Sequence, residues 1–81
     1  MHYDEELDAL DLVCPLPLLH AKKKLNTMQA GKILKVMTKD RSAIIDFKAY
    51  ASVSKHELLK IAVQADVFIF YLKKVEESVD R

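Results

Sequence analysis

The chain has little of what usually punctuates or cross-links a fold. Its 81 residues include one glycine, two prolines, one cysteine and no tryptophan. A single cysteine excludes an intramolecular disulfide, so packing alone must hold the fold, as is usual in a reducing cytoplasm. The scarcity of turn-forming residues argues against a linker, a repeat or a low-complexity segment. We therefore expect one domain over residues 1–81, with its ordered core at about residues 7–74.

Two further absences narrow the class of protein. Thirteen basic residues against twelve acidic ones give a net charge of +1, without the excess of one sign expected of a nucleic-acid or anionic-membrane binder. The apolar run Val67 to Leu72 is strand-sized, far short of the roughly 20 residues that cross a bilayer. The acidic start, residues 4–6, is unlike a secretory signal peptide. These features predict a cytoplasmic protein, monomeric in solution, with no direct nucleic-acid and no membrane partner.

Hydrophobic periodicity predicts six elements in the order βαβαββ. Strands are expected at residues 7–13, 32–38, 57–63 and 67–73. One helix is expected at 15–27, followed by a turn or C-cap at Gly31, and a second helix from a cap at Asp40 or Ser42 to about 52–54. The predicted core positions are Leu10, Leu12, Leu18, Ala21, Leu25, Met28, Ile44, Phe47, Ala51, Leu59, Ile61, Val63, Phe68, Phe70 and Leu72.

Each predicted helix has a single apolar face, so both helices should lie on one side of the sheet. The first strand–helix–strand crossover should be parallel and right-handed. The fold class expected is a two-layer α/β (α+β) sandwich with a four-stranded mixed sheet.

The segment Val13-Cys14-Pro15-Leu16-Pro17 joins the first predicted strand to the first helix. Proline suits the first helical position, and the residue before a proline is extended, as an N-cap residue is. Cys14 is therefore predicted as the N-cap, where the helix dipole favours an anion and lowers the pKa of a thiol. Pro15 and Pro17 remove two N–H groups from the first turn, so the Leu16 N–H should face the sulfur. A lone cysteine is also commonly a small buried hydrophobic residue, and that alternative stays open.

The histidines and the three consecutive lysines have simpler interpretations than the cysteine segment. His2, His20 and His56 lack metal-ligand spacing, so neither a metal nor another cofactor is expected. His20 is interpreted as a solvated surface residue, and for His56 a surface turn residue is one of two equally good interpretations, the other being a position shared with a known family. Lys22 should border the apolar face of its helix, while Lys23 and Lys24 should be solvated. Lys22 and Lys23 are the candidates for partner docking through short-range charge steering.

The cysteine segment, with Leu7-Asp8-Ala9 before it, resembles the TusA/SirA-type sulfur-carrier family, whose signature is Cys-Pro-x-Pro. The likeness continues at Gly31 and through residues 34–36, 40–47, 56–59 and 70–74, nearly the whole chain. It implies a fold like the C-terminal part of initiation factor 3. It also implies that Cys14 carries sulfur as a persulfide, supported by Pro15, Leu16 and Pro17. Asp11 stands where the family usually has glycine and would oppose a thiolate if it faces the same way; Lys55 likewise replaces a glycine found in many members.

The resemblance further implies a sulfurtransferase-type carrier that acts only with partner proteins. Its donor would be a cysteine desulfurase or a rhodanese-like protein. Its acceptor would serve tRNA thiolation, molybdenum-cofactor maturation or sulfur metabolism. The alternative is a small regulatory or redox-sensing interaction module without sulfur transfer, in which Cys14 is structural or forms an intermolecular disulfide.

Overall fold

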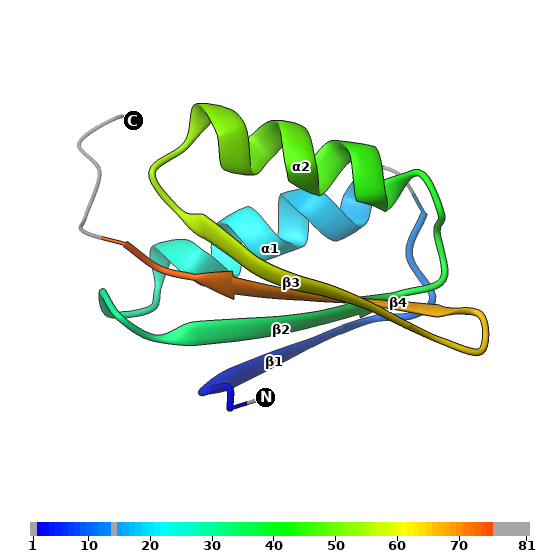
Figure 1. Cartoon of the computed structure of the whole chain (residues 1–81), viewed down its shortest axis with the longest axis horizontal. Helices are drawn as coiled ribbons and strands as arrows, with labels where there is room; N and C mark the ends of the chain where they lie inside the picture. Colours follow the sequence, from blue (N-terminus) through cyan, green and yellow to red (C-terminus); the bar gives the residue numbers. More distant parts are fainter. Residues whose placement is uncertain (1, 14, 76–81) are drawn as a thin grey trace.

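The computed structural model describes residues 2–13 and 15–75; Cys14 and the tail at 76–81, for which fraying was predicted, lie outside the described residues. The elements are β1 (Glu5–Ala9), α1 (Leu16–Asn26), β2 (Ile33–Thr38), α2 (Ala43–Val53), β3 (Glu57–Gln64) and β4 (Val67–Lys73). Both helices cover the same face of the sheet (Figure 1). The predicted βαβαββ order and two-layer arrangement are confirmed.

The four strands form one mixed sheet in the order β1-β2-β4-β3. β1 and β2 are parallel, with Leu7 opposite Val36. β4 runs antiparallel to both of its neighbours, and its Phe70 lies opposite Val36 on one side and Ile61 on the other. The last strand of the sequence is therefore an inner strand of the sheet.

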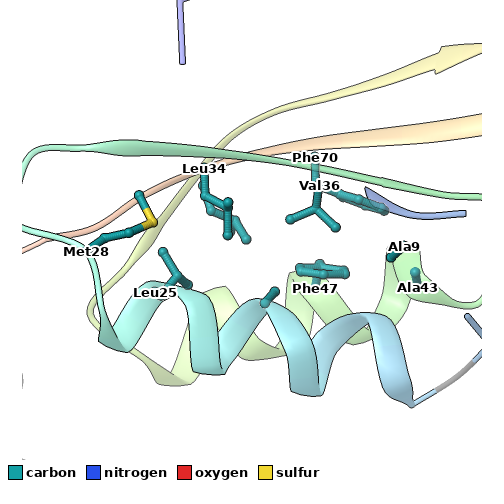
Figure 2. Packing of buried hydrophobic residues seen from close by; sticks show 10 residues of the cluster. Ala9, Leu25, Met28, Leu34, Val36, Ala43, Phe47 and Phe70 are labelled. Atoms are coloured by element: carbon teal, nitrogen blue, oxygen red, sulfur yellow. The ribbon is translucent and has the colours of Figure 1, made fainter. Parts of the chain in front are cut away.

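The core lies between the helices and the covered face of the sheet (Figure 2). The rings of Phe47 from α2 and Phe70 from β4 stack with centroids 4.5 Å apart. Around them alternate residues of the strands meet helix residues spaced three or four apart, as predicted. The cluster comprises Ala9, Ala21, Leu25, Met28, Leu34, Val36, Ala43, Phe47, Phe70 and Leu72.

β1 departs from its prediction. It ends at Ala9, whereas the alternation of Leu10 and Leu12 predicted a strand at 7–13. The Leu10 N–H donates to Asp8 Oδ1 over 3.0 Å, and the Leu12 N–H donates to the Ala9 carbonyl oxygen over 3.1 Å. These two bonds turn the chain, so the loop that leads to Cys14 begins four residues earlier than predicted.

β3 contains an irregularity that the sequence did not predict. Its pairing with β4 shifts between Leu58 and Lys60, which places Leu58 opposite Leu72. Leu58 therefore packs against the core together with Ile61, and the prediction that Leu59 does so is wrong. Val63 lies opposite Phe68 but is 59% exposed, so its predicted burial is also wrong.

The turns use two residues in the left-handed region. Gly31 has φ +92°, which confirms a turn there, although the α1 C-cap is Thr27 and not Gly31. Ala65, at φ +56°, begins the two-residue connection between β3 and β4, where no glycine is available. An L residue with a side chain adopts that conformation at a cost of roughly 1–2 kcal/mol.

The start of α2 confirms the predicted cap region. Asp40 Oδ1 accepts hydrogen bonds from the Ser42 N–H and hydroxyl, at 3.0 and 2.7 Å. Ser42 occupies the N-cap position without a side-chain cap bond of its own, and the helix ends at Val53 as expected. Among the described residues, neither helix is long and apolar enough to cross a membrane.

Candidate functional site

The motif lies at the sheet edge where both helices begin. β1 and β2 are parallel neighbours, and each is followed by a loop that leads into a helix. The loops of residues 10–13 and 39–42 therefore lie at one edge, which we call the site edge (Figure 1). Cys14 itself is outside the described residues. Its chain neighbours are both exposed, Val13 to 66%.

The start of α1 differs from the prediction by one residue. Pro15, not Cys14, is the N-cap residue, and α1 begins at Leu16 with Pro17 second. The Leu16 N–H, predicted to face the sulfur, donates to the Val13 carbonyl oxygen over 2.8 Å, and the sulfur itself lies outside the described residues. Cys14 thus directly precedes the N-cap residue in the sequence. No acidic residue lies in the first turn of α1, so the helix dipole there is not offset.

The two prolines of the motif occupy different environments. Pro15 and Leu16 are exposed, whereas Pro17 is fully buried. From the sequence, both prolines were expected to remove N–H groups from the first turn, and the burial of Pro17 was not predicted. The signal was available, because Pro17 precedes the buried Ala21 and Leu25 by four and eight residues, the spacing of one helix face.

An open pocket of about 440 Å³ lies at the site edge, lined by both loops. Its walls bring charges of both signs together: Asp11 comes from the first loop, and Lys39 and Arg41 come from the second. Asp11, which departs from the family pattern, thus lines the same pocket as Lys39, Arg41 and a second carboxylate, Asp40. The remaining lining residues are Leu10, Leu12 and Val13.

The three consecutive lysines of α1 have separate environments. Lys22 is exposed, with Nζ 5.6 Å from the centroid of the Tyr50 ring, as fits a lysine at the border of the apolar face. Lys23 is exposed as predicted. Lys24 is half-buried and forms an ion pair with Glu5 at 3.3 Å, so the prediction that it is solvated is wrong.

Two buried polar residues lie at the opposite edge. His56, for which a surface turn residue was one interpretation from the sequence, is buried, and its Nδ1 accepts a 3.4 Å hydrogen bond from the Val75 N–H. Lys74 is 2% exposed, and its Nζ donates to the Leu25 carbonyl oxygen over 2.6 Å. Lys74 lies two residues after Leu72 and four after Phe70, so the alternation of β4 predicts its burial. A lysine is normally expected at the surface, and Lys74 was therefore not included in the predicted core. Within residues 2–13 and 15–75, no three His, Cys, Asp or Glu side chains gather as metal ligands.

The fold has a counterpart among solved structures. A SirA-like protein from Desulfitobacterium hafniense superposes with a TM-score of 0.78, covering 90% of this chain and all of that one. At 23% sequence identity this similarity shows the fold alone. The class is therefore a two-layer α+β protein with the fold of that SirA-like structure.

The sequence comparisons give the family. Residues 5–74 match the family model for sulfurtransferase TusA. The chain is 43% identical over 72 residues to the sulfur carrier protein TusA of Allochromatium vinosum, which covers 89% of this chain and 95% of the relative. It is 35% identical over 74 residues to a putative sulfur carrier protein of Bacillus subtilis, covering 91% of this chain and 99% of the relative. This chain belongs to the sulfurtransferase TusA family.

Proposed function

We propose that this protein is a sulfur carrier, in which Cys14 accepts a sulfane sulfur as a persulfide and relays it to a partner protein. One observation carries the proposal. In a chain of the TusA family, the sole cysteine lies between two exposed residues, Val13 and Pro15, at the start of α1. A partner can approach this loop without disturbing the core, which lies on the other side of Pro17.

The transfer balances without an oxidant. The Cys14 thiolate attacks the terminal sulfur of the donor persulfide, a new S–S bond forms, and the old S–S bond breaks. The donor cysteine leaves as a thiolate with the electron pair of the broken S–S bond. The proton of the donor persulfide either remains on the transferred sulfur or is released to the solvent. Passing the sulfur to an acceptor repeats the step with the roles exchanged. The uncompensated dipole of α1 favours the anionic sulfur, so no separate general base is required.

The partners follow from this chemistry. A cysteine desulfurase or a rhodanese-like protein would supply the sulfur, and a protein of tRNA thiolation, molybdenum-cofactor maturation or sulfur metabolism would take it. A reducing cytoplasm would keep the single thiol available. Lys22 and Lys23 are both exposed on a helix without any acidic residue, which supports their role in steering partners.

Intact-mass analysis tests the proposal. After incubation with glutathione persulfide, the wild-type protein should gain one sulfur atom, and Cys14→Ser should gain none. Val13→Ala, which alters the neighbouring position but keeps the thiol, is the matched control and should gain the same mass. Covalent dimers under mild oxidant, with no sulfur adduct from any donor tried, would instead favour the redox-sensing module.

A further inference from the structure

The outer surface of α2 is apolar where a solvated helix is normally polar. Ile45, Ala49 and Val53 follow one another at intervals of four residues, so they share a face, which we call the α2 stripe. Ile45 is 73% and Val53 83% exposed, more than any other large hydrophobic residue in the described chain. Ala43 and Phe47, on the other side of the helix, are buried in the core. α2 is thus apolar on both sides, although only one side is covered.

The uncovered face of the sheet provides a contrast. There Ile69 and Tyr71 of the inner strand β4 are buried although no helix lies over them. The Tyr3 ring contributes to this shielding, with its centroid 6.5 Å from that of Tyr71. The apolar side chains of β4 on this face are therefore removed from water within the chain itself, and those of the α2 stripe are not.

The charges around the α2 stripe are basic. Lys48 and Lys55 are exposed at the helix and just beyond its end, and Lys22 of α1 reaches over Tyr50 of α2. Together the two helices carry four lysines against one aspartate, the half-buried Asp46. Residues 4–11 carry five acidic residues and no basic one. The net charge of +1 therefore conceals a basic helix layer and an acidic first strand.

We propose that the α2 stripe and its lysine rim form the docking surface for the sulfur-donating protein, which presents apolar side chains flanked by acidic ones. This inference rests on the proposed function. Apolar contacts in the centre of an interface supply affinity, while a charged rim selects the partner by complementarity. A second copy would present the same lysines and be repelled. The stripe also begins at Ile45 in the first turn of α2, directly after the loop that lines the pocket at the site edge, so a donor bound there is beside the Cys14 loop.

Transfer kinetics from a protein donor test the docking surface. The probes are a persulfidated cysteine desulfurase and a persulfidated rhodanese-like protein, with glutathione persulfide as a donor that needs no docking. Ile45→Glu and Val53→Glu should raise the KM for a protein donor about tenfold with little change in kcat, since each removes a central apolar contact and adds repulsion. Loading from glutathione persulfide should be unchanged. Val53→Lys should raise the KM less than Val53→Glu does.

Matched controls separate docking from folding. Val63→Glu changes another exposed valine, on β3, and Lys60→Glu changes an exposed lysine of the same strand. Neither should alter the KM, whereas Lys48→Glu should raise it severalfold. Glutamate is a better helix former than isoleucine and suits the first turn of a helix, so Ile45→Glu should keep or raise the thermal midpoint.

The outcomes that overturn the inference are distinct from those that overturn the function. An unchanged KM in all the α2 variants, or loading by glutathione persulfide but by neither protein donor, would reject the docking surface alone. A dimer that Val53→Glu dissociates would show a second copy as the occupant. Sedimentation with phosphatidylglycerol vesicles that Val53→Glu abolishes would show a membrane. Failure of the wild type to load from glutathione persulfide would reject the sulfur-carrier function itself.

Discussion

The site edge and the opposite edge of the sheet are held by different kinds of hydrogen bond. At the opposite edge the bonds join distant parts of the sequence. Asp4 Oδ2 accepts from the Ile33 N–H over 2.9 Å, and Lys74 Nζ donates to the Leu25 carbonyl oxygen over 2.6 Å. The Gly31 N–H adds a 2.6 Å bond to the Lys74 carbonyl oxygen. The start of β1, the end of α1 and the end of β4 are thereby tied together.

At the site edge the described residues include two local bonds. The Leu16 N–H reaches back three residues to the Val13 carbonyl oxygen, and the Ser42 N–H reaches back two residues to Asp40 Oδ1. Local bonds of this kind fix the shape of a loop, whereas the bonds of the opposite edge join distant elements. We therefore expect substitutions at the opposite edge to cost more stability than substitutions at the site edge.

The largest expected effect is at the opposite edge. Lys74→Met keeps the aliphatic volume but removes the buried donor to Leu25, so the free energy of unfolding should fall by about 1.5–3 kcal/mol. Urea denaturation measures this loss, with the exposed Lys32→Met as control. If the two edges are independent, the rate of Cys14 loading from glutathione persulfide stays at the wild-type value. A slower rate in the still-folded variant would contradict the comparison.

Gly31→Ala should have the next largest effect. No atom lies within 4 Å of a Cβ built on Gly31, so any loss comes from its φ of +92° and not from a clash. We expect the free energy of unfolding to fall by roughly 1–2 kcal/mol. Ala65→Gly is the reciprocal change in the β3–β4 turn and should raise stability by about 0.5 kcal/mol. Urea denaturation measures both changes, and destabilisation by both variants would contradict the role given to the left-handed backbone at these two positions.

Pro17→Ala tests the site edge from its buried side. Pro17 is fully buried, so removing about two methylene groups should cost roughly 1 kcal/mol after the gain in helix propensity. Pro15→Ala, at an exposed position, should leave the thermal midpoint nearly unchanged. Both should alter the pH–alkylation profile of Cys14. Equal destabilisation by the two variants would show that the prolines do not differ as their burial indicates.

The smallest expected effect concerns Asp4. The hydrogen bond from the Ile33 N–H is the main reason that the pKa of the Asp4 carboxyl lies below its ordinary value. A lowered pKa in the folded state means that Asp4 stabilises the fold above its unfolded pKa, about 3.9, and that this stabilisation is lost as the pH falls through the folded value. Asp4→Asn should therefore flatten the decline in stability below about pH 4. If the free energy of unfolding falls as steeply with decreasing pH in Asp4→Asn as in the wild type, the Asp4 carboxylate does not stabilise this edge.

The periodic parts of the fold could be predicted from the sequence, because burial there follows the spacing of side chains. The faces of α1 and β4 are examples, with Leu25 and Phe70 in the core as expected. Prediction failed where a backbone bond overrode the pattern. The apolar alternation continues to Leu12, but the hydrogen bond from the Leu12 N–H to the Ala9 carbonyl oxygen ends the strand in a turn. In β3 the shift in pairing with β4 places Leu58, and not the predicted Leu59, against the core.

For the candidate site, the family could be predicted from the sequence, and the geometry of the loops around it could not. The motif around Cys14 indicated the family, and the exposure of Val13 and Pro15 agrees with an accessible loop. The N-cap was misplaced by one residue because the proline rules favoured Cys14. The Leu19 N–H donates to the Pro15 carbonyl oxygen over 3.1 Å, and this first bond of the helix makes Pro15 the N-cap. The pocket unites two loops about 30 residues apart, which local patterns cannot reveal.

The inner position of β4 has a consequence for synthesis on the ribosome. Chains emerge from the N-terminus, yet β2 cannot acquire its second neighbour, nor β3 any neighbour, until Val67–Lys73 has been made. Parallel pairing of β1 with β2 alone leaves a two-stranded ribbon, which is marginally stable at best in water. The loop that carries Cys14 is translated early but acquires its supporting sheet late. During that interval the thiol of Cys14 belongs to a chain whose core is not yet complete.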